Sequence, residues 1–211
     1  MLMYIPADLP EMPEIDESIL NSSEYGPPLE NGKHPWIMRK LTPSINEETD
    51  DYQPKELLEE FKKLNADFID WLKCLPCDSV VNFKIHRQNN NGGVPLHVDL
   101  LQPMRDIMHY HHLYFNEPCG YRIIMNGKRK DTTYLIGPDG EKVYCNMPET
   151  NTNTYIMNYT TGIHGVEEDP GRSILFLQFN IDVKKHQNII ENSIKKYNDY
   201  AVRFDMDKKY G

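Results

Sequence analysis

The hydrophobic residues recur at helical spacing in two parts of the chain. From Leu57 to Trp71 they lie three or four positions apart, and Pro54 is a favourable residue at a helix start. This pattern predicts a helix over 54–74 whose apolar stripe packs on a core. A second helical pattern among Lys, Glu and Asn predicts a surface helix over 184–201.

Between 79 and 182 the pattern changes to short, partly alternating runs separated by turn residues. Asn126-Gly127 predicts a tight hairpin, and Pro138 to Gly140 predicts another turn. Evenly spaced short strands are typical of a β-sandwich, a jelly roll or a barrel. The predicted strand segments are SVVNFKIH (79–86), PLHVDLL (95–101), GYRIIMNG (120–127), TTYLIGPDGEKVYC (132–145), NTYIMNYTTGIHGV (153–166) and RSILFLQFNI (172–181).

The domain organisation follows from these patterns and from the chain length. Residues 1–53 hold many prolines and few periodic segments, so we expect an irregular N-terminal arm packed on the core. The remaining residues, 54–211, are expected to form a single domain, because 211 residues suit one hydrophobic core.

Composition and charge narrow the class of protein. The chain carries 23 Lys and Arg against 32 Asp and Glu, a net charge of −9, which argues against broad nucleic-acid binding. Neither a secretory leader nor a membrane-spanning run is apparent, so a cytoplasmic location and no membrane partner are expected. Cys74 and Cys77 have the spacing of a zinc or redox motif. Cys119 and Cys145 are too far apart to supply a second tight pair, so we interpret the thiols as reduced and structural, with zinc as the alternative.

The candidate chemistry begins at His97 and Asp99, two positions apart in a predicted strand. Side chains at i and i+2 of a strand point to the same face, so both can reach one ion. His164, between two glycines at the end of another predicted strand, is the best third ligand. Two histidines and one carboxylate on one face are expected of non-haem Fe(II) oxygenases. Arg172 follows His164 by eight positions, at the start of the most apolar strand.

In this pattern, His97-x-Asp99 followed by His164 and then Arg172, the sequence resembles the 2-oxoglutarate- and Fe(II)-dependent dioxygenase superfamily over residues 79–180. The resemblance implies a mainly β fold, a double-stranded β-helix of the jelly-roll or cupin type with flanking helices. It also implies Fe(II), 2-oxoglutarate and O2 as cofactor and cosubstrates. The implied activity is hydroxylation, in which decarboxylation of 2-oxoglutarate is coupled to oxidation of a substrate C–H bond. The resemblance also implies that Arg172 makes a bidentate contact with the distal carboxylate of 2-oxoglutarate.

Other polar residues are weaker candidates for the pocket. Arg87 and Arg122 lie in predicted strands and are candidates for contact with an anionic substrate, although each is more often a surface ion-pair partner. Tyr114, Tyr121 and Tyr159 are candidates for hydrogen bonds to the cosubstrate. The segment MHYHHLYF (108–115) holds three histidines but no carboxylate two positions from His109 or His111, and we interpret it as packing or surface.

Two other functions are compatible with the sequence. One is a metal-binding cupin or jelly-roll protein without oxygenase activity, which would not need Arg172 to bind 2-oxoglutarate. The other is a non-catalytic β-sandwich, in which the proline-rich arm contacts a partner and the two histidines lie far apart. The substrate is unidentified on sequence grounds, and a small molecule or a polypeptide is favoured over a nucleic acid.

Overall fold

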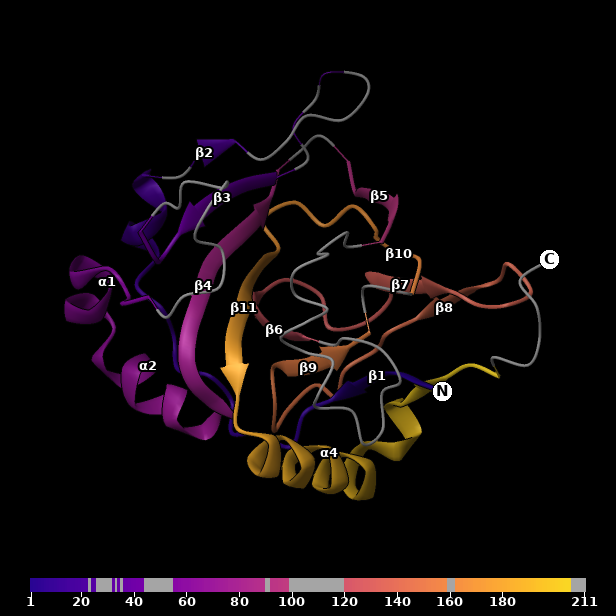
Figure 1. The fold of residues 1–211 in the computed structure, drawn as a ribbon. Coiled ribbons are helices and arrows are strands. Elements are labelled where there is room, and N and C mark those ends of the chain that lie inside the picture. Colours follow the sequence, from indigo (N-terminus) through magenta and orange to yellow (C-terminus); the bar gives the residue numbers. More distant parts are fainter. Residues whose placement is uncertain are drawn as a thin grey trace.

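The computed structural model describes residues 1–22, 24–25, 32, 34, 36–43, 55–89, 92–98, 120–158 and 162–205. Within these residues the protein is mainly β, with twelve strands in two antiparallel sheets (Figure 1). The larger sheet has the order β12-β1-β9-β6-β11-β4-β3-β2, and the smaller has the order β5-β10-β7-β8. The strands are β1 (Leu2–Pro6), β2 (Glu24–Tyr25), β3 (Trp36–Lys40), β4 (Cys77–Gln88), β5 (Val94–His97), β6 (Gly120–Asn126), β7 (Thr133–Ile136), β8 (Lys142–Tyr144), β9 (Thr154–Met157), β10 (His164–Val166), β11 (Ser173–Ile181) and β12 (Val202–Arg203).

The strands from β4 to β11 have the topology of a double-stranded β-helix. In chain order β4, β6, β9 and β11 join the larger sheet, whereas β5, β7, β8 and β10 join the smaller one. The first and last of these strands, β4 and β11, pair with each other along nine residue positions. This crossing between two sheets is the jelly-roll arrangement, and it confirms the predicted fold class.

The two faces of the larger sheet have different environments because side chains alternate along each strand. On the outer face Phe83, Ile85, Leu175 and Leu177 are fully buried in the main hydrophobic core. Figure 1 shows α1 and α2 beside β4 on this outer side, with α4 running past the ends of the central strands. The other face of the sheet points toward the smaller sheet.

The first predicted helix is interrupted at Asn65. The structure has α1 (Glu59–Leu64), α2 (Ala66–Trp71) and a 3-10 turn over Leu72–Cys74 in place of one helix over 54–74. The Asn65 side chain accepts a hydrogen bond from the Asp16 backbone N–H at 2.8 Å and donates to the Phe61 carbonyl at 3.0 Å. These bonds stabilise a non-helical backbone at Asn65. As a consequence Leu64, predicted to lie in the apolar stripe, is exposed.

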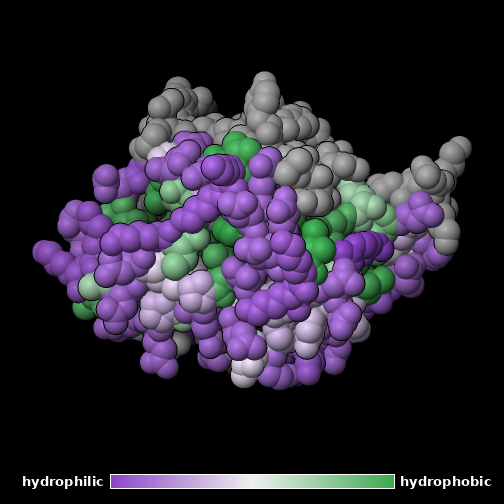
Figure 2. Space-filling view, turned by 90° about the horizontal axis from the view of Figure 1, so that it is seen from below, coloured by the Kyte–Doolittle hydropathy of each residue, from purple (hydrophilic) through white to green (hydrophobic). Residues whose placement is uncertain are grey.

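The C-terminal helix agrees closely with the prediction. Helix α4 covers Val183–Tyr197 and continues as a 3-10 turn over Asn198–Tyr200. The Asp182 carboxylate caps its start by accepting from the Lys185 N–H. Ile189, Ile190 and Tyr197 are buried, so one stripe of the helix packs on the core. Seen from below, the surface of the protein is mainly hydrophilic (Figure 2). Within the described residues no helix has the length and apolarity needed to cross a membrane.

The N-terminal arm is more regular than the prediction of an irregular segment over 1–53. Every residue of β1 is buried, and β1 pairs with both β9 and β12. Strands β2 and β3 extend the far edge of the same sheet beyond β4. Both β1 and β3 are five residues long, too short for a periodic signal to be visible among the prolines.

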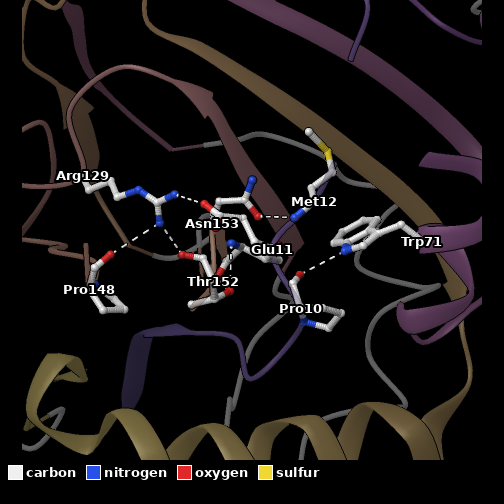
Figure 3. A network of polar contacts seen from close by, with 9 residues as sticks. Pro10, Glu11, Met12, Trp71, Arg129, Pro148, Thr152 and Asn153 are labelled. Atoms are coloured by element: carbon white, nitrogen blue, oxygen red, sulfur yellow. Dashed lines mark hydrogen bonds and ion pairs between the residues drawn. The ribbon is translucent and has the colours of Figure 1, made fainter. Parts of the chain in front are cut away.

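Side-chain to backbone hydrogen bonds fasten the first part of the arm (Figure 3). Trp71 of α2 donates to the Pro10 carbonyl at 2.9 Å, and the Met12 N–H donates to the Asn153 side chain at 2.8 Å. Arg129 reaches across the same region, donating to the carbonyls of Pro148 and Thr152 and pairing with Glu11. The arm is thus attached to α2 and to the turn before β9.

We predict that Arg129→Met lowers the free energy of unfolding by about 1–3 kcal/mol, because two backbone carbonyls lose a charged donor. Glu11→Gln removes only the exposed ion pair and should cost less than about 1 kcal/mol. Urea unfolding followed by tryptophan fluorescence measures both, since Trp71 lies in the same network. An equal loss of free energy of unfolding in the two variants would contradict the assignment of the stabilisation to the bonds between Arg129 and the backbone carbonyls.

Candidate metal and anion site

The space between the two sheets contains a cavity of about 420 Å³. Its walls come from both sheets, and on β4 and β11 from alternate positions of the strand. On β11 the lining residues are Ile174 and Phe176, with Arg172 just before the strand. On β4 they are Lys84, His86 and Gln88. The remaining described lining residues are Trp36, Met38, Val94, His97, Val98, Arg122, Thr133, Tyr155, Met157, His164 and Val166.

His97 and His164 meet on one wall of this cavity. Antiparallel pairing of β5 with β10 places them directly opposite each other, and their ring centroids are 4.3 Å apart. His164 is buried and His97 is partly exposed. The structure therefore brings together two of the three predicted metal ligands, and it does not support the arrangement in which the histidines lie far apart.

Backbone carbonyls fix the orientation of both imidazoles. The Nδ1 of His97 lies 2.8 Å from the Pro95 carbonyl, and the Nδ1 of His164 lies 2.9 Å from the Gly162 carbonyl. A carbonyl oxygen can only accept, so each Nδ1 carries the proton. In the neutral imidazole the lone pair is then on Nε2. This is the tautomer that a histidine adopts when Nε2 binds a metal and the other nitrogen donates to the protein.

The predicted carboxylate ligand, Asp99, lies outside the described residues, as does the histidine-rich segment 108–115. Among the described residues no group of three metal-ligating side chains is present. Strand β5 ends at His97, and Val98, the next residue, also lines the cavity. The role of Asp99 stays a prediction.

Arg172 reaches the same cavity from the start of β11. Its side chain is buried, and its Nη2 donates to the Thr133 hydroxyl at 3.0 Å. Its Nε is buried and finds no hydrogen-bond partner among the described residues. A buried cation with an unsatisfied donor is costly, and an anion in the cavity would satisfy it.

Gly127 makes room for the Arg172 side chain. A Cβ atom at position 127 would lie 2.7 Å from the Arg172 Cγ, and Gly127 also has a positive φ of 109°. The Asn126-Gly127 signal was predicted to mark a hairpin, and that prediction is wrong. Strand β6 belongs to the larger sheet and β7 to the smaller, so the chain crosses between sheets here. The glycine serves the close approach of Arg172.

Of the two further arginines, Arg122 lines the cavity and Arg87 does not lie among the described lining residues. Arg87 alternates with His86 and Gln88 along β4, so it faces the other side of the sheet, where its Nε donates to the Ser173 hydroxyl at 2.9 Å. Tyr121 also faces outward and contacts the His186 Nδ1 at 2.8 Å. Tyr114 and Tyr159 lie outside the described residues.

Several residues of the site were missed by sequence reasoning. Thr133 supplies the hydroxyl next to Arg172, and Tyr155 lines the cavity from β9. Strand alternation contained a signal for both, because each shares its face with a lining residue on a neighbouring strand: Thr133 pairs with Val166, and Tyr155 pairs with Arg122. The contribution of Trp36 on β3 had no such signal, since β3 was not predicted.

None of the described cysteines lines this cavity. Cys74 ends the 3-10 turn and Cys77 begins β4, and neither is a described lining residue. Burial raises the pKa of Cys77 to about 11, and burial raises that of Cys145 also. Thiols with raised pKa values remain protonated at neutral pH and are poor nucleophiles. Cys119 lies outside the described residues.

Comparison with known proteins gives the following. No protein-family model matches the chain, and no curated protein sequence matches it. Among solved structures, an oxidoreductase of the 2OG-Fe(II) oxygenase family from Burkholderia pseudomallei is similar at 14% identity, with a TM-score of 0.43, over 76% of this chain and 75% of that one. OsALKBH1 is similar at 15% identity, with a TM-score of 0.43, over 77% of this chain and 87% of that one. The site described above rests on the geometry of this chain alone.

We predict that Gly93→Ala weakens divalent metal binding at least about tenfold. A Cβ atom at position 93 would lie 2.1 Å from the Val166 carbonyl, so β5 would have to move away from β10 and His97 away from His164. Gly92→Ala is the control, because no atom lies within 4 Å of the added carbon there, and the positive φ of 99° at Gly92 makes it a test of backbone strain without the clash. Calorimetric titration with Co(II) measures both, and equal affinity in the two variants would contradict the prediction.

Proposed function

We propose that this protein is an Fe(II)- and 2-oxoglutarate-dependent oxygenase that oxidises a C–H bond of its substrate, most simply by hydroxylation. One observation carries the proposal. A pair of histidines with Nε2 as the basic nitrogen shares a cavity with a buried arginine whose Nε has no partner among the described residues. A metal and a carboxylate anion are the groups that these two features fit.

The metal would be held by His97, His164 and Asp99. Two imidazoles and one carboxylate leave positions open for other ligands, which is the arrangement that suits non-haem Fe(II). When bound, Fe(II) with 2-oxoglutarate supplies O2 activation coupled to decarboxylation, chemistry that protein side chains cannot perform. The contribution of this chain is to orient the imidazoles, through the Pro95 and Gly162 carbonyls.

The distal carboxylate of 2-oxoglutarate would be held by Arg172 and Thr133. The guanidinium presents several N–H groups in a fixed fork that matches a carboxylate. The Thr133 hydroxyl accepts from Nη2, so its own hydrogen can be donated to the same anion. Burial strengthens these bonds because the surrounding dielectric constant is lower than in water.

The apolar part of the cavity would shield the reaction from water. Val94 and Val166 lie beside the histidines on β5 and β10, and Ile174 lies on the facing strand β11. Such walls leave little room for competing water and strengthen every electrostatic contact inside the cavity.

We predict that His97→Ala and His164→Ala each weaken Fe(II) binding at least about tenfold, because each removes one nitrogen ligand. Anoxic equilibrium dialysis with Fe(II) measures the affinity, and His34→Ala serves as a control histidine that does not line the cavity. If all three variants bind Fe(II) as tightly as the unaltered protein, the metal lies elsewhere and the proposal fails.

We predict that Arg172→Met raises the Kd for 2-oxoglutarate about 30-fold or more, equivalent to about 2 kcal/mol, because the cosubstrate carboxylate would be buried without its cation. Anoxic calorimetry with Mn(II) in place of iron measures binding without turnover. The Kd of Arg172→Lys should fall between those of the unaltered protein and of Arg172→Met, since lysine keeps the positive charge but lacks the bidentate geometry of the guanidinium group. Arg87→Met, on the opposite face of the sheet, is the matched control.

Unchanged 2-oxoglutarate affinity in Arg172→Met, together with metal binding that still depends on His97 and His164, would favour a metal-binding jelly-roll protein without this cosubstrate. Release of succinate and CO2 by the unaltered protein, dependent on Fe(II) and O2, would separate the two functions directly.

A further inference from the structure

Gln88 connects the loop that carries Arg172 to the larger sheet. This loop, residues 167–172, joins β10 of the smaller sheet to β11 of the larger one. Gln88 is the last residue of β4, and its side chain is buried at the wall of the cavity. Within the part of the chain that the structure describes, Gln88 makes four hydrogen bonds to the loop, two through its backbone and two through its side chain.

The two backbone bonds continue the pairing of β4 with β11 beyond Arg87 and Ser173. The Gln88 N–H donates to the Arg172 carbonyl at 2.8 Å, and the Gly171 N–H donates to the Gln88 carbonyl at 3.0 Å. Any residue with a backbone N–H can make these two bonds at position 88. They hold the end of the loop, but they do not require a glutamine.

The two side-chain bonds do require an amide. The Nε2 of Gln88 donates to the Glu167 carbonyl at 3.1 Å, and its Oε1 accepts from the Asp169 N–H at 2.8 Å. A carbonyl can only accept and a backbone N–H can only donate, so the amide satisfies both in one orientation. Gln88 therefore fixes the first and the third residue of the loop with a single planar group.

Asp169 connects this amide to Arg172. The Asp169 carbonyl accepts from the Arg172 N–H at 2.9 Å, and its carboxylate accepts from the Lys128 N–H at 2.8 Å. The Arg172 guanidinium donates to Thr133, the one side-chain hydrogen bond that it makes within the described residues. Because one bond restrains a long side chain weakly, the direction of Arg172 depends on where its backbone is held. That backbone is held by Asp169 and Gln88.

We propose that Gln88 is a positioning residue for the cosubstrate anchor: its amide holds the 167–172 loop so that the Arg172 guanidinium faces the cavity before an anion binds. The inference rests on the proposed function, because it treats Arg172 as the residue that binds the distal carboxylate of 2-oxoglutarate. A cation held in its binding position gives higher affinity, since binding then requires less ordering of the protein. Gln88 acts through Arg172 and not through the metal.

The two histidines are held independently of the Gln88 amide. His164 lies in β10, which pairs with β5 on one side and with β7 on the other. The Glu167 N–H, just after β10, donates to the Thr132 carbonyl at 2.8 Å. Loss of the amide is therefore expected to release the loop beyond Glu167 and to leave β10 paired. This difference separates an effect on Arg172 from an effect on the metal site.

The test variant is Gln88→Met, which keeps the length of the side chain and removes both of its hydrogen bonds. We expect the Kd for 2-oxoglutarate to rise about tenfold, which corresponds to Arg172 facing the cavity about one tenth of the time. Anoxic calorimetry with the full chain loaded with Mn(II) measures this constant. Asn153→Leu is the matched control, because Asn153 is also a buried amide that accepts from a backbone N–H, that of Met12, outside the loop. Its Kd should stay within about threefold of the unaltered value.

A double variant separates positioning of Arg172 from a general loss of the cavity. In the Arg172→Met protein, Gln88→Met should change the Kd for 2-oxoglutarate by less than about twofold, because no guanidinium is left to position. The Kd of Gln88→Met for Co(II) should stay within about threefold of the unaltered value, because both imidazoles are kept. A tenfold rise in the Arg172→Met background, or an equal loss of Co(II) affinity, would show that Gln88 only stabilises the cavity and would overturn the inference.

Hydrogen exchange in the ligand-free protein tests the role of Gln88 without 2-oxoglutarate. The amides of the 167–172 loop should exchange at least about fivefold faster in Gln88→Met, and those of β10 should not change. Unchanged exchange in the loop would overturn the inference. Failure of the proposed function looks different, because the unaltered Mn(II) protein would then not bind 2-oxoglutarate at all. The exchange of the loop would still decide whether Gln88 holds Arg172 in place.

Discussion

The candidate site depends on the antiparallel pairing of β5 with β10. These short strands place His97 opposite His164 in the smaller sheet, and the same pairing brings Val94 against Val166. Backbone carbonyls two positions before each histidine then hold its Nδ1 proton. A shift of one residue in the register would turn one imidazole away from the cavity, because successive side chains in a strand point to opposite faces. The chemistry of the site is thus controlled by a few backbone hydrogen bonds in a four-stranded sheet.

The larger sheet supplies the complementary half of the site by the same alternation. Along β11 the positions occupied by Ile174 and Phe176 face the cavity, and Leu175 and Leu177 face the helices. The buried outer face stabilises the sheet through hydrophobic packing, which leaves the inner face able to carry charged groups whose burial is costly. Arg172 and Arg122 lie at the two ends of this inner face. We interpret the space between them as the region where cosubstrate, metal and substrate meet.

Much of this arrangement follows from the sequence, and the exceptions have physical causes. Strands β4, β6 and β11 were predicted because they are long and rich in β-branched and aromatic residues. The fold class is confirmed. His97 and His164 lie opposite each other, and their role as metal ligands stays a prediction. The interruption at Asn65 was missed, since it depends on a hydrogen bond to Asp16, which is distant in sequence. Strands β1 and β3 were missed because they are stabilised by pairing with β9 and β4 and have no clear local sequence pattern. The stacking of Trp36, His86, Phe176 and Arg122 across four neighbouring strands could not be predicted without knowing the strand order.

The central claim is that one cavity holds a metal on His97 and His164 and a 2-oxoglutarate carboxylate on Arg172. A crystal structure of the protein grown under anoxia with Mn(II) and 2-oxoglutarate tests it most directly. We expect Mn(II) to be bound by the Nε2 atoms of both histidines and by the Asp99 carboxylate, with the distal carboxylate of 2-oxoglutarate on Arg172 and Thr133. A metal bound elsewhere, or a cosubstrate whose distal carboxylate contacts Lys84 and Arg122 in place of Arg172, would contradict it.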